Sequence, residues 1–334
     1  MMLQGDSDSR NPLVSVIVPA YGTAQFIAAT LDSVLAQTYR NFEIVVVNDG
    51  SPDSDELEKV LEPYRSRIIY VRQENQGLAS ARNTGIRASH GEYISPLDSD
   101  DLWDPEHLAA QIAMLEADPS IDMVYADARI FGDVPEAGQT LMALSPPRGE
   151  VTFERLATRQ VSVNICACVI RREILFRAGL FDPTLRRSAP QGTEDIDLWL
   201  RIALHGNRIC YQRRVLAQYR RRGDSLSAES VPMIESFLNV LKKTSRVPNL
   251  SATQLQAIEG QILVEQTQLE IEKGKRAFLA GDPEAAISHL SRANAQRKSW
   301  KISLILLLLR VAPRFLQMLY VWRNRPRYKL RAQP

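Results

Sequence analysis

The stretch Tyr93-Ile94-Ser95-Pro96-Leu97-Asp98-Ser99-Asp100-Asp101 runs from an apolar segment directly into three carboxylates. In an extended chain, residues two apart point the same way, so Asp98 and Asp100 can converge on one target. Two carboxylates held this close favour a hard divalent cation that takes phosphate oxygens as its other ligands. The alternative is an acidic turn before a helix, which Asp104-Pro105 would begin as N-cap and first-turn proline.

Short apolar strands alternate with helical patterns before this stretch. The sequence predicts strands over 14–19, 43–47 and 68–71, and the acidic stretch ends a fourth. This alternation predicts parallel βαβ units with right-handed crossovers. In such a sheet, ligands bind beyond the carboxyl ends of the strands, and Tyr21, Asp49 and Asp98 all lie just past such an end. We therefore expect a ligand site at this edge.

Three common ligand-binding motifs do not occur in the sequence. No G-x-G-x-x-G follows the first predicted strand, and no G-x-x-x-x-G-K-[ST] occurs. The four histidines form neither H-E-x-x-H nor the spacing of a zinc site. A dinucleotide fingerprint, a P-loop and a zinc centre are therefore not expected.

A second acidic cluster, Gly192-Thr193-Glu194-Asp195-Ile196-Asp197, precedes an amphipathic helical pattern that ends at Gly206. Acids in a first helical turn interact favourably with the helix dipole, which is the interpretation we prefer for Asp197. A carboxylate at a helix start that faces a cleft can also serve as a general base.

Seven segments in this order resemble the family-2 inverting glycosyltransferases, over about residues 13–230. The segments are Val-Ile-Val-Pro-Ala-Tyr (16–21), Val-Asn-Asp-Gly-Ser (47–51), Gly-Leu-Ala-Ser-Ala-Arg-Asn (77–83), Leu-Asp-Ser-Asp-Asp (97–101), Ala-Gly-Leu-Phe-Asp (178–182), Glu-Asp-Ile-Asp-Leu-Trp (194–199), and Tyr219-Arg220 leading to Ser225-Leu226-Ser227. The resemblance implies an α/β GT-A fold, with a Rossmann-like mixed, mostly parallel sheet flanked by helices.

The resemblance also implies a nucleoside-diphosphate sugar as donor and Mg²⁺ or Mn²⁺ as cofactor. It places the ring of Tyr21 against the base, gives Asp49 a hydrogen bond from the base, and puts Arg82 near the nucleotide. It assigns Asp98 and Asp100 to the pair of acids around the ribose and the metal, with Asp100 as metal ligand. A bound dication would offset the charge of the leaving diphosphate.

Asp195 matches the catalytic base of the family, which removes a proton from the acceptor hydroxyl as that oxygen attacks the anomeric carbon. A single displacement inverts the stereochemistry. Glu194 is expected on the acceptor side. Arg222 occupies the place where the family often has a histidine; an arginine cannot ligate a metal but can neutralise the diphosphate. The alternative for Arg222 is a solvated basic loop.

The C-terminal part of the chain differs from the rest in composition. We expect a polar tail over 1–12, a GT-A domain over 13–235, a helical hairpin region over 236–297, and an amphipathic basic helix and tail over 298–334. The hairpin around Gly281-Asp282-Pro283 resembles part of a tetratricopeptide repeat, but no second copy follows at the expected period.

Charge is also divided along the chain. From Ala285 onward there are eleven basic residues and no acidic ones, which leaves 30 basic against 39 acidic residues before that point. The basic character is therefore confined to the tail and does not indicate a nucleic-acid partner. Residues 302–331 predict a helix in the membrane interface with a basic end on anionic lipid. A helix buried on the catalytic domain and a membrane span are the alternatives.

Three cysteines and a polar N-terminus without an apolar signal segment predict a cytoplasmic protein with peripheral contact to the inner face of the membrane. Cys166 and Cys168 are expected to face the same side of a core, because they are two apart in an apolar strand pattern.

Taken together, these features predict an inverting hexosyltransferase of cell-surface glycan or polysaccharide synthesis, with a glycan or glycolipid acceptor. One alternative is a non-catalytic scaffold that binds sugar nucleotides. Another is a sugar-phosphate nucleotidyltransferase, but the glycine-rich basic loop that such enzymes need after the first strand is replaced by Pro19-Ala20-Tyr21-Gly22-Thr23.

Overall fold

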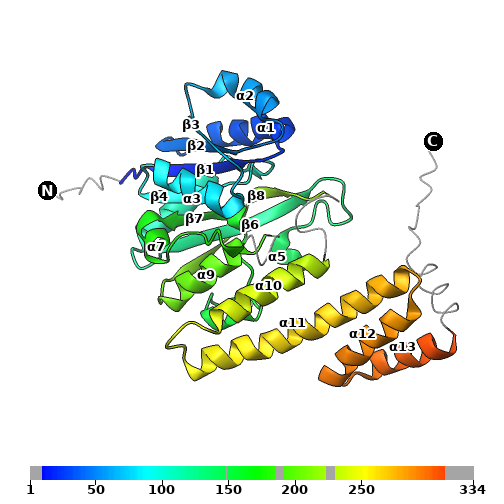
Figure 1. The fold of residues 1–334 in the computed structure, drawn as a ribbon. Coiled ribbons are helices and arrows are strands. Elements are labelled where there is room, and N and C mark those ends of the chain that lie inside the picture. Colours follow the sequence, from blue (N-terminus) through cyan, green and yellow to red (C-terminus); the bar gives the residue numbers. More distant parts are fainter. Residues whose placement is uncertain (1–9, 148, 186–191, 223–229, 313–334) are drawn as a thin grey trace, which may run out of the picture.

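A computed structural model describes residues 10–147, 149–185, 192–222 and 230–312. Its centre is an eight-stranded sheet in the order β3-β2-β1-β4-β7-β6-β8-β5 (Figure 1). The strands are β1 (Val14–Ala20), β2 (Phe42–Asp49), β3 (Ile69–Gln73), β4 (Tyr93–Pro96), β5 (Leu102–Trp103), β6 (Met123–Phe131), β7 (Cys168–Arg171) and β8 (Ile209–Arg220).

Helices cover both faces of the sheet and form the C-terminal part of the chain. They are α1 (Ala24–Leu35), α2 (Ser54–Leu61), η1 (Glu62–Tyr64), α3 (Leu78–Ala88), α4 (His107–Ala117), α5 (Leu141–Leu144), α6 (Phe153–Ala157), η2 (Ile165–Ala167), α7 (Arg172–Arg177), α9 (Glu194–Leu204), α10 (Ser230–Thr244), α11 (Ala252–Leu279), α12 (Pro283–Gln296) and α13 (Trp300–Val311).

The sheet is mixed but mostly parallel, as the sequence predicted. β1 pairs in parallel with β2 and β4, β2 with β3, and β6 with β8. β7 runs antiparallel between β4 and β6, and the short β5 runs antiparallel to β8. The strand order reverses between β1 and β4, and a crevice at the carboxyl ends of the strands is expected at this reversal.

The apolar residues of each strand divide between two cores. All seven residues of β1 are buried: Val14, Val16 and Val18 face a core formed with α1, α2 and α4, whereas Ile17 faces the other. This second core includes side chains of α3, α9 and α10. Each fully buried aliphatic side chain contributes about 1.5–3 kcal/mol.

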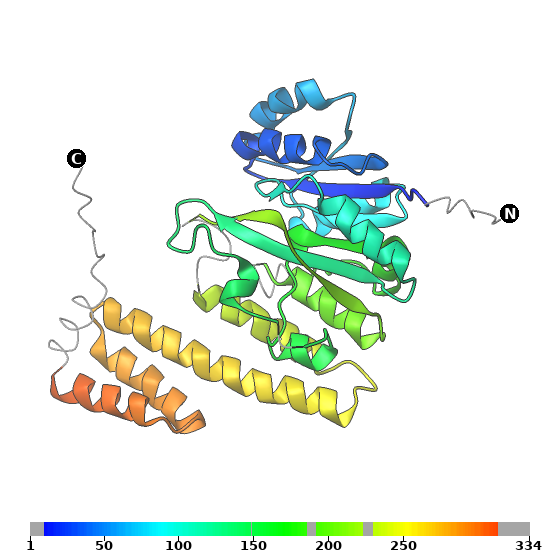
Figure 2. The ribbon, with the colours of Figure 1, turned by 180° about the vertical axis from the view of Figure 1, so that it is seen from behind.

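The C-terminal helices run under the sheet domain and extend beyond it (Figure 2). α11 begins beside α10, α12 lies next to its far half, and α13 packs on α12. Ala286 and Leu290 of α12 pack against Leu306 and Leu309 of α13 in a small separate core. Among the described residues, no helix is both long enough and apolar enough to cross a bilayer. The expected membrane segment 302–331 is described only to residue 312.

Helix α10 is continuous across the boundary that the sequence suggested at residue 235. Its residues Phe237, Val240 and Leu241 are fully buried in the core under the sheet, and Ile258 of α11 joins them. Since this packing belongs to the sheet domain, we propose to place the end of that domain after Thr244.

Two local expectations were wrong. Cys166 and Cys168 face opposite cores, because Cys166 lies in the 3₁₀ turn η2 and only Cys168 is in a strand, so the two-residue alternation does not hold. Asp104 is not the N-cap of α4, which begins at His107; its carboxylate instead accepts the backbone N–H of Glu106 at 3.1 Å.

Gly85 of α3 lies so close to the sheet that a Cβ atom there would be 2.5 Å from Cγ2 of Ile17 and 3.2 Å from Cγ2 of Val47. We expect Gly85→Ala to lower the free energy of unfolding by about 1–3 kcal/mol, because the packed core must shift. Chemical denaturation measures this. The matched control is Gly260→Ala in α11, where nothing lies within 4 Å; it should stabilise by about 0.4–1 kcal/mol. Equal destabilisation of both variants would contradict the close packing.

Candidate functional site

A cavity of about 880 Å³ opens at the carboxyl ends of β1, β2 and β4. It brings together every site residue that the sequence predicted: Tyr21, Asp49, Arg82, Asp98, Asp100, Glu194, Asp195 and Arg222. These residues come from positions spread over 200 residues of sequence. The parallel arrangement of the strands accounts for the convergence of Tyr21, Asp49 and Asp98, because it places successive strand ends at one edge. Arg82, Glu194 and Asp195 reach the cavity from the helices α3 and α9.

One end of the cavity is formed by the segments that follow β1 and β2. Tyr21 is 52% exposed and follows β1 directly. Asp49, the last residue of β2, is nearly buried, and its carboxylate accepts hydrogen bonds from Gln73 Nε2 at 2.7 Å and from the backbone N–H groups of Gln76 and Gly77 at 2.9 and 2.8 Å. Asp49 therefore also fixes the entrance to α3, a role that sequence reasoning missed.

The acidic stretch after β4 is held in place from behind. The Thr30 hydroxyl donates to the carbonyl oxygens of Ser99 and Asp101, at 3.0 and 2.9 Å. Asp101 is buried, and its carboxylate accepts the backbone N–H of Arg220 at 2.7 Å. The third acid of the stretch is therefore used to anchor the loop to the end of β8, while Asp98 and Asp100 line the cavity.

Asp100 sits in a negative, half-enclosed environment. Burial and the nearby carboxylate of Asp98 raise the pKa of Asp100 to about 6. The guanidinium of Arg222 offsets part of this, with Nη2 3.9 Å from Oδ2 of Asp100. The Arg222 guanidinium also lies over the ring of Phe26, at 4.8 Å. A cation between Asp98 and Asp100 would relieve the repulsion between them.

Arg82 is the most deeply buried charge of the site, with 1% of the residue exposed. Its Nη2 lies 2.6 Å from Oδ1 of Asp98, and its Nη1 lies 2.5 Å from Oε1 of Glu194. Burial opposes its charge, but the two carboxylates raise the pKa of Arg82 above its ordinary value. Its guanidinium also lies 5.3 Å from the centre of the Phe181 ring. Sequence reasoning put Arg82 near the nucleotide and did not foresee this bridge between two acids.

Asp195 lies in the first turn of α9 and lines the cavity. Its Oδ1 accepts the backbone N–H of Ile196 at 2.7 Å. Burial, followed by the negative charge of Glu194, raises the pKa of Asp195 to about 7, although Arg82 acts in the opposite direction. A carboxylate with such a pKa can both take up and release a proton near neutral pH.

The far wall of the cavity depends on helices beyond the sheet. Met233 of α10 and Arg159 both line it. Arg159 has φ 53° at the C-terminal end of α6, a left-handed position that usually takes glycine. Its guanidinium lies 4.0 Å from the centre of the Phe237 ring of α10, and its Nη1 lies 3.7 Å from Oε1 of Glu265 of α11. No motif in the sequence indicated these contacts.

Comparisons with known proteins show that the chain is similar in sequence to glycosyltransferases. The family described as Glycosyl transferase family 2 matches residues 15–179. An uncharacterized glycosyltransferase of Rickettsia felis is 35% identical over 196 residues, which are 57% of this chain and 31% of that protein. Another from Rickettsia typhi, RT0329, is 31% identical over 232 residues, which are 68% of this chain and 70% of that protein. The chain spans about a third of the length of the first curated relatives that it matches.

Solved structures share the fold. TarS 1–349 of S. aureus, in complex with UDP-GlcNAc, aligns with a TM-score of 0.61 and 19% identity, over 89% of this chain and 87% of that one. The mannosyltransferase PcManGT of Pyrobaculum calidifontis, in complex with GDP-Man and Mn²⁺, aligns with a TM-score of 0.60 and 21% identity, over 94% and 85%. The expected GT-A fold is thereby confirmed.

Proposed function

Because this chain belongs to glycosyl transferase family 2, we propose that it transfers a sugar from a nucleoside-diphosphate sugar to an acceptor hydroxyl, with inversion, in the synthesis of a cell-surface glycan or polysaccharide. The observation that carries the proposal is the cavity in which Asp195, with a pKa of about 7, lies together with Asp98 and Asp100. The nucleotide-sugar complexes of the structural neighbours support the class of donor.

The donor would lie across the carboxyl ends of β1, β2 and β4. The exposed ring of Tyr21 supplies a face for the base, and Asp49 retains acceptor capacity on Oδ2 after binding Gly77 N–H. Asp98, which Arg82 holds through an ion pair, would contact the ribose. Arg222 supplies positive charge beside Asp100, where the diphosphate would lie.

A divalent cation fits this donor set. Among the side chains that the structure describes, no three of His, Cys, Asp and Glu gather to hold a metal. Mg²⁺ and Mn²⁺ sites in nucleotide enzymes commonly use one or two carboxylates and complete their shell with phosphate oxygens. Asp100, with Asp98 beside it, would hold the cation. When bound, the cation offsets the charge that develops on the leaving diphosphate.

Asp195 would remove the proton from the acceptor hydroxyl as that oxygen attacks the anomeric carbon. The bond to the diphosphate breaks in the same displacement, and the configuration inverts. Burial raises the pKa of Asp195 and with it the basicity of the carboxylate. Glu194, which is paired with Arg82, would lie on the acceptor side, and Asp195 would accept the proton.

The rate of sugar transfer should rise as the pH rises through about 7, because Asp195 must be unprotonated to act as base. Asp195→Asn should lower kcat by about 10²–10⁴-fold and remove this pH dependence. Product formation across neutral pH, with a donor identified from a panel of sugar nucleotides, measures both effects.

Donor binding should be nearly unchanged in Asp195→Asn, which calorimetry with the nucleoside diphosphate tests. A kcat close to that of the wild type would overturn the assignment of the base. Donor binding without hydrolysis or transfer in the wild type would indicate a non-catalytic scaffold instead.

Asp100→Ala should lose most of the gain in nucleotide affinity that Mn²⁺ provides, because one of two adjacent carboxylates is removed. Titration of the nucleoside diphosphate with Mn²⁺, and again with a chelator, measures this gain. If the variant keeps the full metal-dependent gain, Asp100 is not a ligand.

We also propose peripheral attachment to the cytoplasmic face of a membrane through the exposed side of α13. Trp300, Leu304, Leu307 and Val311 form a stripe at helical spacing, from 46% to 75% exposed, opposite the residues that pack on α12. Exposed Lys298, Lys301 and Arg310 flank this stripe, and the basic residues beyond 312 lie outside the described part of the chain. An apolar stripe with basic flanks fits an anionic lipid surface. The free cysteines accord with a cytoplasmic location.

The protein should sediment with vesicles of phosphatidylcholine and phosphatidylglycerol, and high salt should weaken this binding. Leu307→Glu should reduce binding roughly tenfold or more, because burial of a leucine contributes about 1.5–3 kcal/mol. The matched control is Leu255→Glu, at an exposed leucine in the first turn of α11, the end away from α12. This variant should bind like the wild type. Undiminished binding of Leu307→Glu would show that α13 does not contact lipid.

A further inference from the structure

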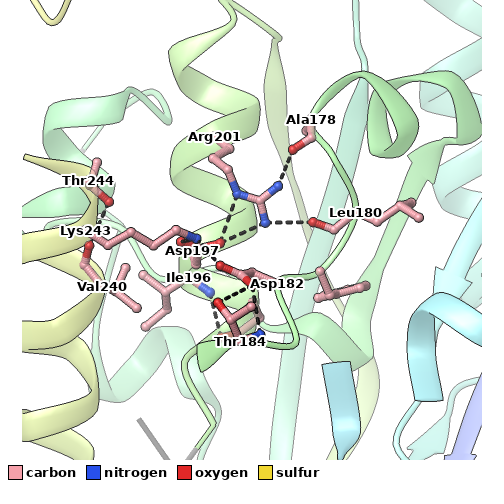
Figure 3. Close-up of polar contacts among 12 residues, drawn as sticks. Ala178, Leu180, Asp182, Thr184, Ile196, Asp197, Arg201, Val240, Lys243 and Thr244 are labelled. Carbon is pink, nitrogen blue, oxygen red and sulfur yellow. Dashed lines mark hydrogen bonds and ion pairs between the residues drawn. The ribbon is translucent and has the colours of Figure 1, made fainter. Parts of the chain in front are cut away.

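Four charged side chains meet behind the first turn of α9 (Figure 3). Lys243 Nζ lies 2.6 Å from Oδ1 of Asp197 and 2.6 Å from Oδ2 of Asp182. Arg201 approaches the other oxygen of Asp197, with Nε at 2.9 Å and Nη2 at 2.8 Å. Arg201 also donates to the carbonyl oxygens of Ala178 and Leu180. The charges therefore form a connected network between three segments of the chain.

Asp197 is the centre of this network, and only 2% of its side chain is exposed. A buried carboxylate is costly unless cations and hydrogen-bond donors compensate it. Lys243 satisfies one oxygen and Arg201 the other. The sequence suggested that Asp197 serves the helix dipole, and Asp197 does lie in the first turn of α9. Its burial and its two partners add ion pairs that the sequence did not indicate.

Of the two acids bound by Lys243, Asp197 belongs to the helical turn that lines the cavity, and Asp182 belongs to a segment that packs against Arg82. Asp197 is two residues after Asp195, in the same helical turn. Asp182 follows Phe181, whose backbone N–H and C=O are both bonded to the side chain of Asn83, at 3.0 and 2.7 Å. Arg82, next to Asn83, lies over the Phe181 ring and pairs with Glu194. Lys243 therefore links two segments that also meet around Arg82.

Lys243 lies on α10, after the part of the chain that matches the family. The apolar side of α10 is already buried through Phe237, Val240 and Leu241, so burial of the helix does not require a lysine. The ion pairs of Lys243 with Asp182 and Asp197 instead determine which side of α10 faces the first turn of α9. Small displacements of a reacting group can cost large factors in rate.

We propose that Lys243 is a positioning residue for Asp195, which it holds in place through Asp197 and the first turn of α9. The proposal rests on the proposed role of Asp195 as general base. It makes α10 a functional part of the transferase, in addition to its part in the core.

The test compares Lys243→Met with Lys242→Met, its neighbour on α10, which is exposed and carries the same charge. Lys243→Met should lower kcat between about tenfold and 100-fold and leave the KM for the donor within about twofold. Lys242→Met should behave like the wild type, and Lys243→Arg should restore part of the loss. Each kcat is normalised to the concentration of nucleotide-binding sites, so that unfolded protein does not count.

Lys243→Gln provides a second variant that keeps a hydrogen-bond donor and removes the charge, in case Lys243→Met does not fold. An unchanged normalised kcat in Lys243→Gln or Lys243→Met would overturn the proposal, as would an equal loss in Lys242→Met. Asp195→Asn is assayed in parallel. If Asp195→Asn keeps its activity, Asp195 is not the general base. If Asp195→Asn loses activity while the Lys243 variants keep theirs, only the positioning role of Lys243 is refuted.

Discussion

The buried guanidinium of Arg82, between the carboxylates of Asp98 and Glu194, is the interaction on which the rest of the site depends. It joins α3, the loop after β4 and the start of α9, three elements that are far apart in sequence. Removal of one partner from a buried ion pair typically costs about 3–5 kcal/mol, because the remaining charge has no compensation. Both acids therefore have fixed positions before any ligand binds.

Local sequence patterns predict much of the fold and several of the residues that line the site. The apolar runs of β1, β2 and β4 define strands, and helical patterns between them require parallel pairing. The polar residues Tyr21, Asp49 and Asp98 then meet at one edge because each follows a strand end. Asp195 could be placed at the same cavity only through the resemblance to a family, since 97 residues separate it from Asp98.

The sequence could not show what holds these residues in place. Arg82 pairs with an acid 112 positions away, and Lys243 binds an acid 61 positions before it. Such pairs depend on how helices pack and leave no periodic signal. The same limit explains Cys166, whose side of the sheet was set by a 3₁₀ turn. The boundary expected at residue 235, where the sequence pattern becomes wholly helical, lies within α10.

Met233 lines the far wall of the cavity, and the Phe237 ring lies 4.0 Å from the guanidinium of Arg159 in the same wall. Both belong to α10, which follows residue 179, the last residue of the family match. The matched segment builds the end of the cavity around Tyr21 and Asp49 and also supplies Arg159, whereas α10 adds Met233 to the opposite wall. Two relatives with equal similarity in the matched segment can thus have opposite walls of different shape and charge. Replacement of α10 during evolution would change the wall at Met233 while the end around Tyr21 and Asp49 is inherited unaltered.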